Sequence, residues 1–256
     1  MKPIENIGSA TLNGIARLGR FGSFFLRSLI TAFQPPIKFR RILQRFHFIG
    51  TKSLWLILLI SIFTGAVLAL QVYYTLVKFG AEGRVGTVVA LAMIRELGPV
   101  ICALMVTGRA GSSLASELGI MKNTEQFDAL RIMGLDSYRY FMSPILIASI
   151  VSVFLLTAIF NVVGIIGGYL VAGGLLQSSY GAYFGSITNF LGMYDIYNGA
   201  LKSLVFGALI AWVSTYKGYY TDYGAEGVSR ASTDAVVLSS VLILVSDYVM
   251  TSLMFQ

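Results

Sequence analysis

Apolar residues along the chain gather into five long runs that short polar stretches separate. We predict spans at residues 53–77, 85–107, 144–172, 201–216 and 235–255. About 20 apolar helical residues are enough to cross the hydrocarbon layer of a membrane. The fourth run is the shortest, carries Lys202 at one end, and could begin as early as Ile196. The pattern therefore predicts an all-α integral membrane protein with about five transmembrane helices.

A different pattern precedes the first span. Between residues 7 and 33, apolar side chains recur at spacings of three and four, at Ile15, Leu18, Phe21, Phe25, Leu29 and Phe33. Arg17, Arg20 and Arg27 lie elsewhere on the same helix. Such a basic amphipathic helix is typical of the membrane interface, and its periodicity favours it over a disordered tail. We expect Pro35 and Pro36 to end it, before a second basic stretch at residues 38–45.

The chain is thus divided into an interfacial segment, residues 1–52, and a transmembrane domain, residues 53–256. Of its 256 residues, 56% are hydrophobic and 12% are charged, about half the charged fraction of a soluble domain. The net charge is +7, and nine of the 19 Lys and Arg residues precede residue 53. This distribution indicates contact with anionic membrane lipids, and we expect no nucleic-acid partner.

The loops predict an orientation, because Lys and Arg concentrate on the cytoplasmic side of a membrane. The N-terminal segment and the loop at residues 108–143 are basic, whereas residues 173–198 contain no Lys or Arg. Five spans then place the N-terminus in the cytoplasm and the C-terminus outside.

Two ionisable residues, Arg95 and Glu96, lie inside the second span. Charged side chains at membrane depth are costly and face a protein interior or a water-filled cavity. Gly98 and Pro99 follow directly, and we expect them to weaken the helix, since proline removes a backbone donor. The residues leave two interpretations open: a polar substrate contact or helix break at a cavity, or an internal pair that fixes helix packing.

The loop at residues 108–143 contains a predicted short helix. We expect Thr124 to cap it, with Glu125 in its first turn and Gly134 ending it. Its apolar side would carry Phe127, Leu130 and Met133, and its polar side Glu125, Asp128 and Arg131. Such a helix can insert into a groove of a partner protein or pack on its own membrane domain, and the residues favour neither.

Several functions are made less plausible by what the sequence lacks. It has no GxxxxGK[ST] phosphate-binding loop, so we do not expect the chain to hydrolyse ATP. It also has no HExxH or paired acidic motif, and we predict neither a cofactor nor a metal site. Gly164 and Gly168 form a GxxxG spacing, which permits close helix approach but often arises by chance.

A set of short strings, in order along almost the whole chain, resembles the MlaE/YrbE family. These strings are LQVY (70–73), RELGPV (95–100), GRAGS (108–112), TEQ (124–126), ALRIMG (129–134) and GVSRA (227–231). Members of that family are permeases of MCE-associated ABC transporters, which move phospholipid between the two membranes of Gram-negative envelopes. Ser137 and Ile145 depart from the family pattern, and both lie at the edge of the coupling region.

The resemblance implies an inner-membrane homodimer that works with a cytoplasmic ABC ATPase subunit and a periplasmic MCE-domain protein. It implies that Thr124 to Asp136 is the coupling helix for the ATPase. It also implies a phospholipid cavity near the second span, with Glu96 and its neighbour Arg95 at the cavity. We expect the cavity wall on the first span to be formed by Leu68, Val72, Thr75, Leu76 and Phe79.

The resulting prediction is the permease subunit of an ABC transporter that maintains outer-membrane lipid asymmetry. Two alternatives remain from the residues alone. One is an ion-coupled secondary transporter that uses Glu96 as its proton site, although no internal repeat supports it. The other is a non-transporting membrane scaffold, which would tolerate substitution of Glu96.

Overall fold

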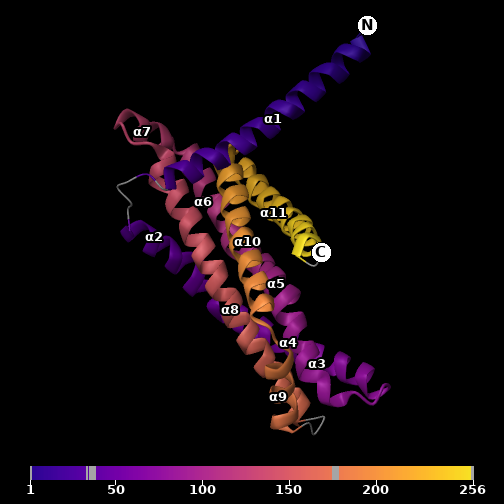
Figure 1. Cartoon of the computed structure of the whole chain (residues 1–256). Helices are drawn as coiled ribbons and strands as arrows, with labels where there is room; N and C mark the ends of the chain where they lie inside the picture. The colour runs from indigo at the N-terminus through magenta and orange to yellow at the C-terminus, as the bar shows by residue number, and fades with distance from the viewer. Residues whose placement is uncertain (1, 33, 35–38, 175–178, 255–256) are drawn as a thin grey trace.

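The protein is described here by a computed structural model covering residues 2–32, 34, 39–174 and 179–254 (Figure 1). Every regular element in these residues is a helix, which confirms the all-α prediction. Five helical segments are long and apolar enough to cross a membrane, as the hydropathy pattern predicts. The segments are Phe39–Val77, Glu82–Asn123, Tyr138–Gly174, Met193–Tyr219 and Gly224–Met254.

Three of these segments are composite. Short π-helical turns join the α-helices of the first two segments, and one precedes the α-helix of the third. The first contains α2 (Phe39–Phe46), η1 (His47–Thr51) and α3 (Lys52–Val77). The second contains η2 (Glu82–Arg84, a 3-10 turn), α4 (Val85–Ala92), η3 (Met93–Leu97), α5 (Gly98–Val106), η4 (Thr107–Gly111) and α6 (Ser112–Asn123). The third contains η5 (Tyr138–Met142) and α8 (Ser143–Gly174). The division that we predict at residue 52 therefore falls within a continuous helical segment.

The last two spans are longer than the sequence predicted. Helix α10 covers Met193–Tyr219 and helix α11 covers Gly224–Met254, so both begin earlier than expected. Polar residues near their starts, such as Asp195 and Glu226, lower the mean hydropathy of the first turns, so the hydropathy pattern did not include these turns in the spans. Between α8 and α10 lies a short helix, α9 (Tyr180–Phe190), whose Ser179 side chain accepts a hydrogen bond from the Ala182 amide at 3.2 Å.

Helices α3 and α8 form a close crossing at the centre of the bundle. A Cβ atom on Gly65 would overlap the carbonyl of Gly164, and one on Gly168 would come 3.2 Å from the carbonyl of Gly65. The Ser61 hydroxyl completes the crossing by donating to the Phe160 carbonyl at 2.5 Å. The GxxxG spacing of Gly164 and Gly168 therefore does mark a close helix contact.

One of the two interpretations included a helix break at Gly98 and Pro99, and no break occurs there. The chain stays helical through both residues, with η3 directly before Pro99. Proline has no backbone N–H and its ring crowds the carbonyl four residues back, which here belongs to Arg95. The wider π turn relieves that crowding, since an inserted residue rotates the two flanking α-helices relative to each other.

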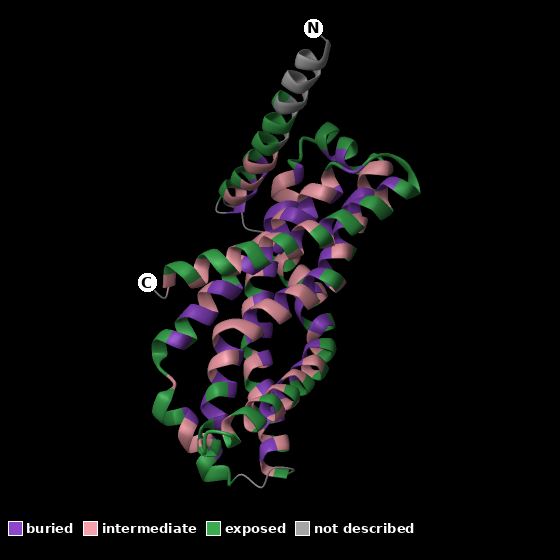
Figure 2. Ribbon diagram, turned by 90° about the vertical axis from the view of Figure 1, so that its right-hand side faces the viewer, coloured by how far each residue is buried: buried purple, intermediate pink, exposed green. Residues whose placement is uncertain are grey.

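The N-terminal helix α1 (Lys2–Ala32) leaves the bundle at an angle, so that its first half stands apart (Figures 1 and 2). Its second half is anchored by aromatic contacts. Phe21 stacks on Trp212 with ring centroids 4.0 Å apart, and the Trp212 indole donates to the Phe21 carbonyl at 3.0 Å. Ile15 and Leu18, from the predicted apolar face, are exposed. Phe33 and the Pro35–Pro36 pair lie outside the described residues.

Candidate functional site

The main polar cluster within the spans is centred on Lys202 of α10. Its side chain is 1% exposed, and its ammonium lies 2.5 Å from a Glu96 carboxylate oxygen and 2.8 Å from one of Asp247. The ammonium also donates to the Thr251 hydroxyl at 2.7 Å and to the Arg95 carbonyl at 3.0 Å. A single buried ammonium thus connects η3, α10 and α11.

The contact with the Arg95 carbonyl explains how a proline is accommodated at this depth. In an α-helix the residue at position 99 would donate to that carbonyl, but proline cannot. Lys202 supplies a donor instead. Buried carbonyl groups need hydrogen-bond partners, especially where lipid replaces water. The π turn, Pro99 and Lys202 are therefore parts of one local arrangement.

A second ion pair holds the start of α10 against the same turn. The Arg95 guanidinium reaches one carboxylate oxygen of Asp195 with Nη2 at 2.6 Å and Nε at 2.7 Å. The other Asp195 oxygen accepts from the Gly192 amide at 3.0 Å and so caps α10. The Asp195 side chain is only 6% exposed, so the charge of Arg95 is matched in a largely dry environment.

Close backbone contacts bring these groups together. A Cβ on Gly199 would overlap the Ile94 carbonyl, and a Cβ on Gly98 would overlap the Asn161 side chain. Since only glycine permits such approach, α10 packs directly on η3 while the start of α5 packs on α8. Lys202 lies one helical turn beyond Gly199 and therefore faces the carboxylate of Glu96.

Both residues of the predicted Arg95–Glu96 pair have internal partners, on α10 and α11. The packing interpretation is thus supported by geometry. The two side chains are nevertheless 34% and 38% exposed, so each also reaches the molecular surface. Arg95 and Glu96 can therefore keep their internal ion pairs and still contact a molecule bound at the surface.

A groove lies next to this turn, between α3 and the second span. It has a volume of about 370 Å³ and is lined mainly by apolar side chains. The lining residues are Phe63, Thr64, Val67, Leu68, Gln71 and Leu97. Leu68 is thus the one residue of the predicted cavity wall that lines it. Val72 and Leu76 pack partly against the core, and Thr75 and Phe79 are exposed nearer the end of α3.

Sequence reasoning missed the ammonium of Lys202, its partner Asp247 and the Asp195 partner of Arg95. Lys202 was placed at the edge of a short span, whereas α10 extends nine residues before it. Neither Asp195 nor Asp247 was assigned a partner. The available signal was that single ionisable residues in three different spans must find partners, because unpaired charges in lipid are costly.

The predicted coupling helix is present as α7 (Gln126–Ile132), with one correction at its start. The cap predicted at Thr124 is wrong. The Thr124 hydroxyl donates to the Ile120 carbonyl at 2.9 Å and so ends α6, while Glu125 precedes α7 in the left-handed conformation (φ 57°). Gly134 ends the helix as predicted, with φ 72° and the Leu135 amide bonded to the Leu130 carbonyl at 2.9 Å.

The two sides of α7 have different surroundings. Phe127 and Leu130 are 5% and 7% exposed, and the Phe127 ring contacts Tyr219 at a centroid distance of 5.1 Å. Their side of the helix packs on the chain's own bundle. Ile132 and Met133, in contrast, are 88% and 63% exposed. Asp128 and Arg131 are also largely exposed, and they lie 3.6 Å apart.

No group of three or more His, Cys, Asp or Glu side chains among the described residues is placed to hold a metal ion. Cys102 is a buried free thiol in α5.

Comparison with known proteins gives a consistent result. A family model described as "Permease MlaE" matches residues 42–253. The chain is 37% identical to the "Intermembrane phospholipid transport system permease protein MlaE" of Haemophilus influenzae, over 98% of this chain and 97% of the relative. It is 43% identical to a "Probable ABC transporter permease protein" of Rickettsia bellii, with the same coverage. It is also 38% identical, over 86% of this chain and 63% of the relative, to the chloroplast protein TRIGALACTOSYLDIACYLGLYCEROL 1 of Arabidopsis thaliana.

Proposed function

The chain belongs to the MlaE permease family, and we propose that it is the membrane-spanning subunit of an ABC transporter for phospholipid. Its Haemophilus relative is the permease of an intermembrane phospholipid transport system, and that relative matches over nearly the full length of both chains. The nucleotide-hydrolysing step belongs to a partner subunit. The protein itself provides the path for the lipid.

The observation that carries this proposal is the pairing of an apolar groove with a partly exposed charged turn. A phospholipid needs apolar walls for its acyl chains and a few polar contacts for its headgroup. Leu68 and Leu97 line the groove, and Arg95 and Glu96 immediately precede Leu97. We infer that the acyl chains occupy the groove and that the headgroup contacts the exposed edges of Arg95 and Glu96.

Lys202 and Asp195 would have a positioning role in this scheme. They hold Glu96 and Arg95 in fixed directions, so that binding of a headgroup does not require the two side chains to be ordered at that moment. Their own burial keeps them from contacting the lipid.

The link to ATP hydrolysis would run through α7. The exposed Ile132 and Met133 offer an apolar contact to an ATPase subunit, whereas Phe127 and Leu130 fix α7 to the bundle. Helix α7 follows α6, and α6 continues through η4 and α5 into η3. A displacement of α7 by the ATPase would pass through the turn at Thr124 and Glu125 into this run of helix, which reaches back to Glu96. The π turns along this path are places where a helix can change its twist.

The complete assembly that we propose is an inner-membrane homodimer with cytoplasmic ATPase subunits and a periplasmic MCE-domain protein. The basic N-terminal segment and the loop carrying α7 would face the cytoplasm, and the end of α11 would face the periplasm. The exposed apolar residues of α11, such as Val241 and Leu244, suit either lipid or the second copy.

The proposal is tested by reconstituting the permease with its ATPase and MCE partners in liposomes that contain fluorescent phospholipid. We expect lipid movement that requires ATP and persists when the proton gradient is dissipated. Movement that stops with the gradient, while ATP is still present, would identify an ion-coupled transporter instead.

A further inference from the structure

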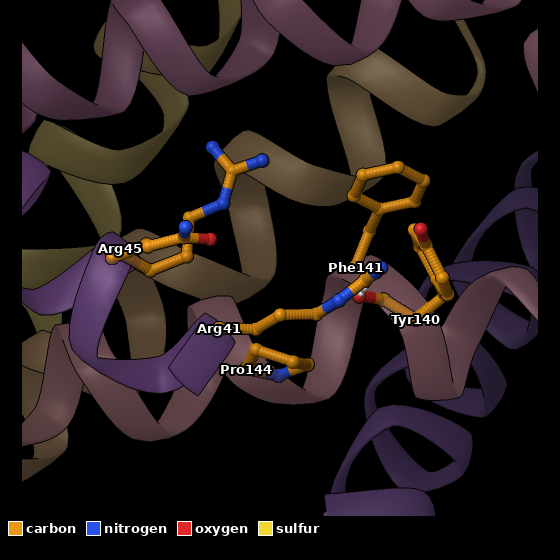
Figure 3. Close-up of a pocket in the computed structure, with 6 residues that line it drawn as sticks. Arg41, Arg45, Tyr140, Phe141 and Pro144 are labelled. Atoms are coloured by element: carbon orange, nitrogen blue, oxygen red, sulfur yellow. Dashed lines mark hydrogen bonds between the residues drawn. The ribbon is translucent and has the colours of Figure 1, made fainter. Parts of the chain in front are cut away.

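A basic site lies at the α2 end of the first span and shares no lining residue with the groove described above. It is a hollow of about 240 Å³ between α2 and the η5–α8 junction. Its lining residues are Arg41, Gln44, Arg45, Tyr140, Phe141 and Pro144. Figure 3 shows the Arg41 side chain reaching from α2 across to Tyr140 and Phe141. A neighbouring hollow shares Arg41 and Gln44 and adds Phe39 and Arg40.

The charges of the three arginines are not equally matched. Arg45 makes a two-pronged ion pair with Glu117 of α6, with distances of 2.6 Å and 2.8 Å. Arg41 instead donates to the Tyr140 carbonyl at 3.2 Å and lies over the Tyr140 ring. Within the described part of the chain, no carboxylate lies within ion-pair distance of Arg40 or Arg41. The hollow therefore has a net positive charge.

The carbonyl and ring contacts fix the direction of Arg41 but leave its charge without a counterion. A guanidinium has five N–H donors in a planar fork, a geometry that matches the oxygens of a phosphate group. The fixed position also reduces the side-chain entropy lost when a ligand binds. The site is thus suited to a phosphodiester anion.

The apolar neighbours of the hollow identify the source of that anion. Phe39 and Leu43, on the same eight-residue helix, are 72% and 56% exposed. Helix α2 lies nearer α7 than α9 (Figure 1), and it carries Arg40, Arg41 and Arg45. Exposed apolar and cationic side chains occur side by side at the boundary between acyl chains and headgroups.

We propose that this hollow binds the headgroup of a resident anionic phospholipid, with its phosphate on Arg41 and its acyl chains along Phe39 and Leu43. Basic pockets between transmembrane helices at the cytoplasmic side are suited to anionic headgroups. The bound lipid would fasten α2 to η5 and would remain in place during transport. This inference does not depend on the proposed transport function.

The test uses the full chain purified in mild detergent, without partner subunits. Phosphatidylglycerol or phosphatidylethanolamine is titrated in, and bound lipid is counted by native mass spectrometry. We expect the wild type to bind phosphatidylglycerol about tenfold more tightly than phosphatidylethanolamine, because the positive charge of Arg41 repels the headgroup ammonium of phosphatidylethanolamine. Arg41→Ala removes this preference. The matched control Arg84→Ala, at the far end of the first two spans, retains it.

Arg41→Lys keeps the positive charge but lacks the planar N–H donors of the guanidinium. It provides a second variant if Arg41→Ala unfolds. We expect Arg41→Lys to keep part of the preference. An undiminished preference in Arg41→Ala, or an equal loss in Arg84→Ala, would overturn the proposal. Added inorganic phosphate is expected to leave lipid binding unchanged. Full displacement of the lipid by inorganic phosphate would identify a free-phosphate site and would also overturn the proposal.

Discussion

The ammonium of Lys202 lies 2.5 Å from the carboxylate of Glu96, a residue 106 positions earlier in the chain. This contact joins the fourth span to the π turn of the second and is extended by Asp247 from the fifth. Three of the five spans are therefore held together by one buried cation. Glu96 is also 38% exposed, so the residue that pairs with Lys202 is one that we propose contacts the lipid headgroup.

Lys202 is expected to be essential for stability. Lys202→Met would leave Glu96 and Asp247 without their cation, and loss of one partner from a buried ion pair costs about 3–5 kcal/mol. Thermal melting in detergent would therefore show a strong decrease for this variant. The matched control is Lys217→Met, which breaks a more exposed pair with Asp234 and should cost no more than about 1 kcal/mol. Equal effects of the two substitutions would argue against a buried network.

Glu96→Gln is expected to separate folding from transport. Glutamine keeps the shape of the side chain and can accept from Lys202, so assembly should be preserved. Loss of the negative charge weakens its polar contact with a headgroup, and we expect lipid retention to fall about tenfold. Quantifying phospholipid in purified wild-type and variant protein measures this effect. Unchanged retention together with unchanged transport would favour a purely structural role for Glu96.

The two sides of α7 should respond differently to a charge. Ile132→Asp places a carboxylate on an 88% exposed position, so the fold should be unaffected while binding of the ATPase is lost. Leu130→Asp buries a carboxylate in an apolar contact and should lower the melting temperature before any binding is measured. Melting curves and co-purification of the ATPase distinguish the two. Normal ATPase binding by Ile132→Asp would exclude this surface as the coupling contact.

The crossing of α3 and α8 should not tolerate a methyl group. Gly65→Ala would push a Cβ into the Gly164 carbonyl, and overpacking of this kind costs about 1–3 kcal/mol. Gly108→Ala is the control, since nothing lies within 4 Å of the added atom. Expression and melting temperature should fall for Gly65→Ala alone. A stable Gly65→Ala variant would mean that the helices can separate without loss.

The spans could be predicted from sequence because their signal is the summed apolarity of about 20 residues. The end of α7 was equally accessible, since Gly134 adopts a backbone conformation that glycine favours. Thr124 was misassigned because a threonine hydroxyl can serve either of two roles. It can cap the start of the helix that follows, or it can bond to the last carbonyls of the helix that precedes it, as it does here. Only the left-handed turn at Glu125 decides between these roles.

The candidate site was harder to predict because it depends on contacts between distant segments. Hydropathy placed Lys202 at a boundary, whereas its partners come from three other helical turns. The π turn at η3 was not predicted, since one inserted residue hardly changes the spacing of apolar positions. The predicted cavity wall used helical spacing along α3, and that spacing cannot tell which side of the helix a groove occupies. Leu68 lines the groove, whereas Phe63, Val67 and Gln71, which also line it, were not among the predicted wall residues.

The most direct test of the account is purification of the tagged full chain from native membranes under mild conditions. The eluate is assayed for ATPase activity and for bound phospholipid, with Ile132→Asp as the matched variant. We expect the wild type to bring both an ATPase and phospholipid, and Ile132→Asp to keep the phospholipid while losing the ATPase. A wild-type eluate with neither ATPase activity nor phospholipid would contradict the assignment as a lipid-transporting ABC permease.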